Sequence, residues 1–412
     1  MGAEQGINAG DTAWVMISAG LVMLMTPALA FFYGGMVRRK NILSILMKCF
    51  ACLGMVLILW ALYGYSLAFG HGNGFIGSLE WVGLRGVGAA PNPDYSSTIP
   101  HAAFMIFQAM FAVITPAVVI GSLVERIKFS SFLVFVALWV TSVYIPVAHM
   151  VWSPDGWLRG LGALDFAGGC VVEINCGVAG LVTALVLGKR QGLTRPTLHN
   201  LPLVVLGGGL LWFGWLGFNA GSALAANGVA VNAFVTTNLS AAAAACSWAA
   251  VEWLVTGKPT MFGTVSGVVA GLVAITPACG FVAPMAAICI GLVAGGLSFF
   301  AVSVIKQKLG YDDSLDAFGV HGIGGFWGMV ATGIFGTVSV NAAGTDGLLA
   351  GNPVFLRTEF VAALVTVAYC AAVTFVIAVV VDKWLGLRVS AEEEIMGLDI
   401  TQHYERAYTM LE

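Results

Sequence analysis

The sequence predicts an all-α polytopic membrane protein with eleven transmembrane helices, and two features of its composition indicate this. Of its 412 residues, 59% are hydrophobic and only 9% are charged, whereas a soluble domain carries about 25% charged residues. Glycine occurs 53 times, well above the usual ~7%, and small residues let membrane helices pack closely. The composition excludes a soluble enzyme, a disordered chain and a secreted disulfide scaffold. A net charge of −3 provides no basic surface for nucleic acid.

The apolar stretches define the predicted spans, because the hydrocarbon core of a bilayer requires about 20 mostly apolar residues per helix. A connection at 70–100, rich in Gly and Pro, is the longest break between them. We predict one membrane domain over 1–382, followed by a cytoplasmic tail over 383–412. The expected spans are 12–37, 42–69, 101–123, 130–151, 164–188, 201–221, 229–255, 261–277, 281–304, 316–338 and 356–382.

The distribution of Lys and Arg predicts the orientation. With the N-terminus outside, all of these residues except Arg85, Arg159 and Arg357 fall in inner connections or in the tail. Positive charge is retained on the cytoplasmic side, so we expect an N-out, C-in chain with an odd number of spans. No basic residue precedes Arg38. Because a signal peptide needs a basic start, we expect no cleaved signal.

Among the ionisable residues in or at the start of predicted spans, four stand out: Asp165, Glu173, Asp316 and His321. Such groups are costly in a membrane and mark functional sites by default. Glu173 lies two helical turns beyond Asp165, and we expect His321, at similar depth in the other half, to be its partner. Alternatives stay open, since an Asp at a helix start is often an N-cap and a buried His can be a satisfied core residue.

Cysteine and histidine show no metal-ligand spacing, and we expect neither a metal nor a cofactor. The eight cysteines lie mostly in apolar runs. The pair Cys49-x-x-Cys52 lacks the strand–helix context of a redox motif, and we interpret these two residues as small buried hydrophobes. No P-loop and no nucleophile elbow is present. A membrane enzyme is therefore not favoured.

Six segments of distinctive sequence are spread in order over nearly the whole chain. They are MTPALAFFYGG (Met25–Gly35), SVYIPVAHMVW (Ser142–Trp152), DFAGG (Asp165–Gly169), WLGFNAGS (Trp215–Ser222), TPACG (Thr276–Gly280) and FGVHG (Phe318–Gly322). These segments, together with the tail from Gly386 to Asp399, resemble the signatures of the Amt/Mep/Rh ammonium transporters, and the Amt branch fits best.

The resemblance implies an architecture and a location. It implies eleven helices, N-out and C-in, built as an inverted five-helix repeat, which is a common plan among transporters. It also implies a homotrimer with one pore per subunit in the lipid bilayer of the plasma membrane, the inner membrane in bacteria. The matching tail permits a PII-type regulatory protein to bind at the cytoplasmic face.

The resemblance also implies roles for particular residues. Phe111, Trp152 and Ser222 correspond to the outer recruitment site for ammonium, and Asp165 to the buried carboxylate that supports it. Phe111 and Phe218 correspond to a stacked phenyl gate.

His321 corresponds to the second of the paired pore histidines. In the family pattern Asp-Phe-Ala-Gly-Gly-x-Val-Val-His the last residue is the first histidine of that pair, and this chain has Glu173 there.

These roles predict a mechanism. Ammonium donates to the Ser222 hydroxyl while it lies over the Trp152 face, and potassium gains only the cation–π part. An apolar pore penalises a bare charge, so we expect deprotonation and passage of ammonia and a proton, with the Glu–His pair as the relay.

The alternative function is an ammonium sensor with the same fold, conducting poorly and signalling to a cytoplasmic domain outside this sequence. Glu173 keeps this alternative open. So does the closing Leu411-Glu412, which is typical of a cloning junction.

Overall fold

The structure is a computed structural model that describes residues 6–191 and 198–408. Over these residues the chain forms helices and isolated β-bridges, with no β-strand. Ten helical segments are long and apolar enough to cross a membrane. An eleventh apolar helix, α11 (Met261–Ile275), is shorter, at 15 residues. Together they correspond to the eleven predicted stretches, whereas Leu411-Glu412 lies outside the described residues.

The spans vary in length, and several change helix type along their course. The unbroken spans are α1 (Ala9–Met36), α4 (His101–Leu123), α9 (Leu201–Gly221), α10 (Gly228–Thr256) and α15 (Pro353–Leu385). The composite spans are η1–α3 (Arg39–Phe69, with α2 at Ile42–Leu59), α5–α7 (Phe129–Gly160, with α6 at Ile145–Trp152), η5–α8 (Gly169–Ile174 and Asn175–Leu187), α12–α13 (Pro284–Leu309) and η7–α14 (Phe318–Gly322 and Ile323–Phe335). Two short helices follow in the tail, α16 (Ala391–Met396) and α17 (Leu398–His403).

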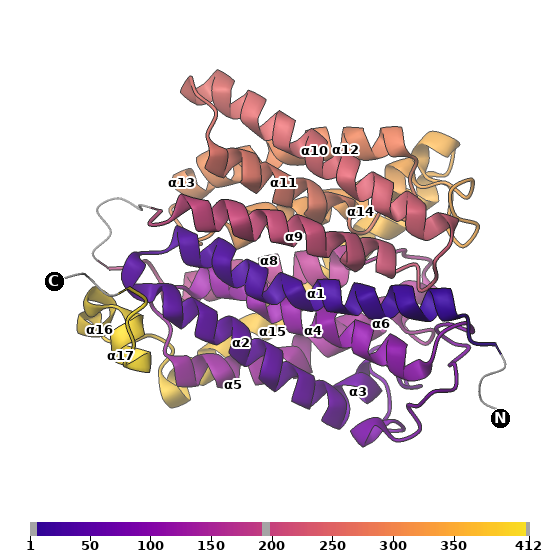
Figure 1. Cartoon of the computed structure of the whole chain (residues 1–412), viewed down its shortest axis with the longest axis horizontal. Coiled ribbons are helices and arrows are strands. Elements are labelled where there is room, and N and C mark those ends of the chain that lie inside the picture. Colours follow the sequence, from indigo (N-terminus) through magenta and orange to yellow (C-terminus); the bar gives the residue numbers. More distant parts are fainter. Residues whose placement is uncertain (1–5, 192–197, 409–412) are drawn as a thin grey trace.

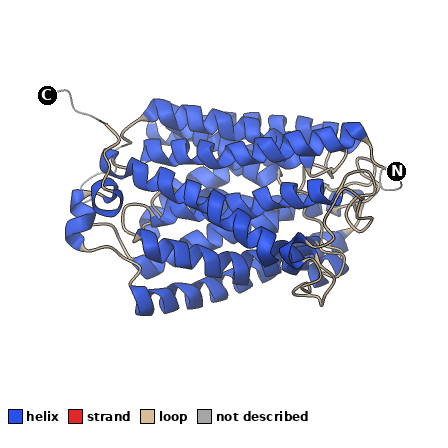
Figure 2. Cartoon of the chain, turned by 60° about the horizontal axis from the view of Figure 1, so that its bottom comes forward, coloured by secondary structure: helices blue, strands red, loops and turns tan. Residues whose placement is uncertain are grey.

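The helices run side by side along the long axis of the molecule, and loops gather at its two ends (Figures 1 and 2). The N-terminus and the 70–100 connection lie at one end, and the tail helices α16 and α17 lie at the other (Figure 1). An odd number of spans places the two termini on opposite sides. The ends are called here the N-terminal end and the tail end.

The fifth and tenth spans begin later than predicted. Their helices start at Gly169 and Phe318, so Asp165 and Asp316 precede the helices that the predicted ranges 164–188 and 316–338 placed them in. Asp316 has a left-handed backbone, with φ +64°. Hydropathy alone does not distinguish a polar residue in a span from one in the turn before it.

Both of these spans open with a π-helical segment, η5 and η7. One opens the fifth span and the other the tenth, the corresponding places in the two five-helix halves that the family resemblance implies. The spans touch through glycine, because a Cβ on Gly177 would lie 2.2 Å from the backbone nitrogen of Gly322. Segments of π-helix are frequent at functional sites, and this contact brings two of them together in the centre of the bundle.

Ion pairs hold the loops together at the tail end. Glu125 Oε2 lies 2.9 Å from Arg38 Nε and 3.3 Å from Arg190 Nη1. Asp312 lies 2.9 Å from Arg190 and 3.0 Å from Arg126. Arg190 holds the pKa of Asp312 at about 2 against the effect of burial. These residues come from four separate predicted inner connections, so the structure gathers at one end the loops that the Lys and Arg distribution assigns to one side.

The tail packs against this end of the bundle. Arg388 pairs with Glu394 at 2.8 Å. The backbone nitrogen of Leu398 donates to Asn41 Oδ1, and that of Ser44 donates to Asp399 Oδ1, both at 2.8 Å. The last span runs to Leu385, three residues beyond the predicted boundary, before the tail folds back onto α2.

Candidate functional site

A cavity of about 190 Å³ opens near the N-terminal end, between α4, α6, α9 and the 70–100 connection. Phe111, Trp152 and Ser222 all line it, so the structure brings the three predicted recruitment residues together. Asp94, from the 70–100 connection, and Arg159, from the short helix α7 (Trp157–Gly160), lie at the same cavity. The site therefore combines an aromatic face and a hydroxyl with one carboxylate and one guanidinium group.

Backbone hydrogen bonds hold the two polar groups of this cavity. Trp152 Nε1 donates to the backbone carbonyl of Asp165 at 2.8 Å, and the Trp152 ring meets Phe111 edge to face, with centroids 5.8 Å apart. The Ser222 hydroxyl donates to the carbonyl of Phe218 at 2.8 Å. Because its proton is committed, the Ser222 oxygen is left as an acceptor. An acceptor beside an aromatic face suits a small cation that carries N–H donors.

Two phenyl rings close the inner side of the cavity. Phe111 and Phe218 have ring centroids 4.3 Å apart and planes 33° apart, and each residue is only 1% exposed. Phe111 lines the outer cavity, whereas Phe218 lines the next one inward. The ring pair therefore separates two spaces that would otherwise join.

Two smaller cavities, each of about 20 Å³, continue the path. That volume suits about one water molecule. The middle cavity is lined by Phe218, Glu173, His321 and apolar residues, and the inner one by His321, Asp316 and Ser266. Since His321 lines both, the three cavities form a row interrupted first by the phenyl pair and then by this imidazole.

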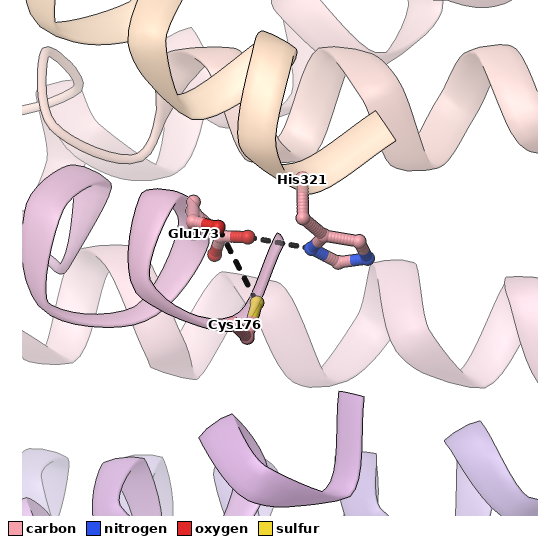
Figure 3. A group of neighbouring side chains, drawn as sticks. All are labelled: Glu173, Cys176 and His321. Carbon is pink, nitrogen blue, oxygen red and sulfur yellow. Dashed lines mark hydrogen bonds and ion pairs between the residues drawn. The ribbon is translucent and has the colours of Figure 1, made fainter. Parts of the chain in front are cut away.

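Glu173 and His321 lie side by side in the middle of the bundle (Figure 3). His321 Nδ1 and Glu173 Oε2 are 2.7 Å apart, in a hydrogen bond between two buried side chains. The other carboxylate oxygen, Glu173 Oε1, has no hydrogen-bond partner. Two titratable groups in direct contact titrate as a coupled pair, and Glu173 Oε1 remains able to accept a hydrogen bond.

Asp165 caps the π-helical segment η5 with both carboxylate oxygens. Oδ1 accepts from the backbone nitrogens of Gly168 and Gly169, and Oδ2 from those of Cys170 and Val171, at 2.6 to 3.2 Å. Its link to the recruitment cavity runs through its backbone carbonyl, which accepts from Trp152. The geometry thus matches the capping alternative, and any effect of its charge on a cation acts without contact.

Among the buried polar residues that the sequence did not reveal as important, three bear on the fold or on the pore. Glu125, which was given no role, is 2% exposed and is ion-paired. Glu359, in α15, is fully buried and accepts from the backbone nitrogen of Leu164 at 2.7 Å. Its place inside an apolar stretch was an available signal.

Cys176 was the third omission. Cys and His alone show no metal-ligand spacing, whereas the spacing Glu173-x-x-Cys176 joins a carboxylate to a thiol. In the structure the ligand atoms of Glu173, Cys176 and His321 all lie within 4.8 Å of one another.

Comparison with known proteins places this geometry in a family. A family model described as Ammonium Transporter Family matches residues 13–408. A protein of Bacillus subtilis named "Ammonium transporter" is 55% identical over 402 residues, covering 98% of this chain and 99% of its own. The crystal structure of Saccharomyces cerevisiae Mep2 superposes with a TM-score of 0.89 at 37% identity, over 95% of this chain and 90% of that one. A structure titled "Sensor Amt Protein" superposes with a TM-score of 0.87 at 29% identity, over 96% of this chain and 98% of that one.

Proposed function

The chain belongs to the ammonium transporter family, and on that premise we propose that it carries ammonium across the plasma membrane through a pore within each subunit. The observation that carries the proposal is the row of three cavities, which runs from Trp152 and Ser222, past Phe111 and Phe218, to His321. It connects a site suited to a cation with a site suited to proton transfer.

Recruitment takes place in the outer cavity. Ammonium has the charge of potassium and a similar size, so charge and radius do not separate the two ions. Ammonium also carries four N–H donors, and the free acceptor capacity of Ser222 lies in the same cavity as the Trp152 ring. A cation over a partly desolvated aromatic ring gains about 2 kcal/mol. Ammonium gains in addition a hydrogen bond to the Ser222 oxygen, which potassium does not form.

Passage along the pore beyond the phenyl pair requires loss of the charge. The path beyond Phe218 is lined mainly by apolar side chains and has room for about one water, so an ion there lacks the hydration that it leaves behind. Glu173 and His321 line the cavity directly behind Phe218 and form a 2.7 Å hydrogen bond. Ammonium gives its proton to this pair as it enters that cavity, the pair passes the proton on, and ammonia continues as the neutral species. Asp316 and Ser266 line the cavity that follows.

The assembly and the regulator belong to the same proposal. The chain forms a homotrimer, and the complete row of cavities inside one chain supports one pore per subunit. A PII-type regulatory protein docks at the tail end, where the tail helices and inner loops form one surface. The sensor alternative is not favoured: the relative named as a transporter is 55% identical, and the sensor structure 29%.

The test is an electrical recording on the whole protein reconstituted in vesicles on a solid-supported membrane. A transporter gives a current on an ammonium pulse and none on an equal potassium pulse, and the current grows with the amount of protein. A chain that binds ammonium, as shown by calorimetry, yet gives neither current nor uptake would contradict transport and restore the sensor alternative.

A further inference from the structure

Three side chains of the kinds that bind transition metals meet in the pore: Glu173, Cys176 and His321 (Figure 3). All three are buried, and their ligand atoms lie within 4.8 Å of one another. We propose that this trio binds one divalent cation of the zinc class, and that the bound ion blocks the pore. Over residues 6–191 and 198–408 this is the one group of three such side chains found close enough to share an ion.

The backbone sets up the trio. Glu173 and Cys176 stand three residues apart at the junction of η5 and α8, a spacing that places two side chains on one helix face. His321 comes from η7 in the other half. The two spans approach closely enough because Gly177 faces Gly322. The ligands therefore come from two rigid helical elements that already lie in contact.

The donor atoms are those that zinc takes. Zinc binds Cys sulfur at about 2.3 Å and His nitrogen and carboxylate oxygen at about 2.0–2.2 Å, in a tetrahedron. His321 Nδ1 and Glu173 Oε2 are 2.7 Å apart, and the Cys176 thiol donates to the Glu173 carbonyl at 3.4 Å, so small side-chain rotations enclose an ion. Glu173 Oε1 has no partner to give up. Mg²⁺ and Ca²⁺ prefer all-oxygen sites and are disfavoured by the thiol and the imidazole.

The charge of the trio selects a divalent ion. A carboxylate and a thiolate together carry two negative charges, and a neutral imidazole adds none. A divalent cation brings the sum to zero, which a buried apolar site requires, whereas a monovalent copper ion leaves a net negative charge. Coordination releases the Cys176 thiol proton to solvent. The proton of the Glu173–His321 hydrogen bond moves from Nδ1 to Nε2 of the same imidazole, which stays neutral and leaves Nδ1 free to bind the ion. No oxidant or reductant takes part.

Occupancy has a functional consequence. Three protein ligands leave one position of the tetrahedron open, and the middle cavity beside Glu173 and His321 has room for about one water or ammonia there. The ion takes the same two atoms, Glu173 Oε2 and His321 Nδ1, that form the hydrogen bond of the pore pair. It therefore fills the path and removes the proton relay at once.

The binding experiment uses the full chain purified in detergent, with Co²⁺ as a spectroscopic probe and Zn²⁺ in calorimetry. We expect one ion per chain and a thiolate-to-cobalt charge-transfer band. Loss of an outer partner of a metal ligand costs about 10–100-fold in affinity, so Cys176→Ala, which removes a direct ligand, weakens binding by at least about tenfold and abolishes the band. Cys176→Ser, closer in shape, does the same if Cys176→Ala fails to fold as the wild-type oligomer. Cys52→Ala, another fully buried cysteine, retains both signals.

The block is measured as the ammonium current with Zn²⁺ relative to the same variant without it. We expect Zn²⁺ to suppress the wild-type and Cys52→Ala currents and to spare that of Cys176→Ser. Absence of saturable binding, or a cobalt band unchanged in both Cys176 variants, would overturn the site. Equal suppression in Cys176→Ser would overturn the block. Because the band is read without any current, failure of the proposed transport function and failure of the metal site are told apart.

Discussion

Replacement of Asp165 by Asn tests whether one carboxylate organises the start of the fifth span. A simple N-cap tolerates Asn as well as Asp. Here each carboxylate oxygen accepts two backbone N–H groups, and an amide has one acceptor oxygen and one donor nitrogen. In Asp165→Asn, two of the four buried backbone N–H groups therefore lose their acceptor, and the side-chain NH₂ group of the asparagine faces them instead.

The cost follows from those two bonds. A hydrogen bond to a charged group contributes about 1.5–3 kcal/mol, so Asp165→Asn destabilises by about 3–6 kcal/mol, with a decrease in Tm on the order of 5 °C or more. The assay is thermal unfolding of the purified protein in detergent. Asp346→Asn is the matched control, because Asp346 accepts one exposed backbone N–H at 3.0 Å. A Tm for Asp165→Asn within about 1 °C of the wild type would refute this reasoning.

Three further changes have definite expected outcomes. Trp152→Leu removes about 2 kcal/mol of cation–π stabilisation and raises the half-saturating ammonium concentration roughly thirtyfold; an unchanged value in current recordings would count against the outer site. Gly177→Ala forces a Cβ to within 2.2 Å of Gly322 and lowers the yield of folded protein in size-exclusion chromatography, whereas Gly54→Ala, with open space around it, leaves it unchanged. Burial of His403 in the tail lowers its pKa from 6.5 to about 4. A tail released from the bundle therefore binds more protons than the docked tail, and docking weakens as the pH falls from about 6.5 toward 4. We expect limited proteolysis to cut the tail faster at about pH 5 than at pH 7.5, and equal rates would contradict the docked position of α17.

Composition and hydropathy predicted the fold because a membrane protein must form its spans from long apolar stretches. All eleven predicted stretches correspond to helices. The predicted starts of the fifth and tenth spans were too early, because Asp165 and Asp316 lie in the turns that precede the π-helical segments η5 and η7. A hydropathy window averages over such a turn and does not show it.

The candidate site was predictable only in part from the residues themselves. Glu173 and His321 stood out because ionisable groups are rare in spans, and they form a hydrogen bond. The grouping of Phe111, Trp152 and Ser222 came from the family resemblance, since these residues lie far apart in the chain. Cys176 was not found, because the local spacing Glu173-x-x-Cys176 gains significance only through the contact with His321, which lies far away in the chain.

The most direct test of the account is the ammonium-induced current of Glu173→Gln compared with the wild type across a range of pH, in the same reconstituted vesicles. Glutamine keeps the shape and the hydrogen-bonding capacity of Glu173 but does not ionise, so it separates charge from packing. If the Glu173–His321 pair relays the proton, the variant folds as the wild-type oligomer and still binds ammonium, but its current falls and its pH dependence changes. A Glu173→Gln current that matches the wild type in size, pH profile and selectivity over potassium would contradict the proton relay.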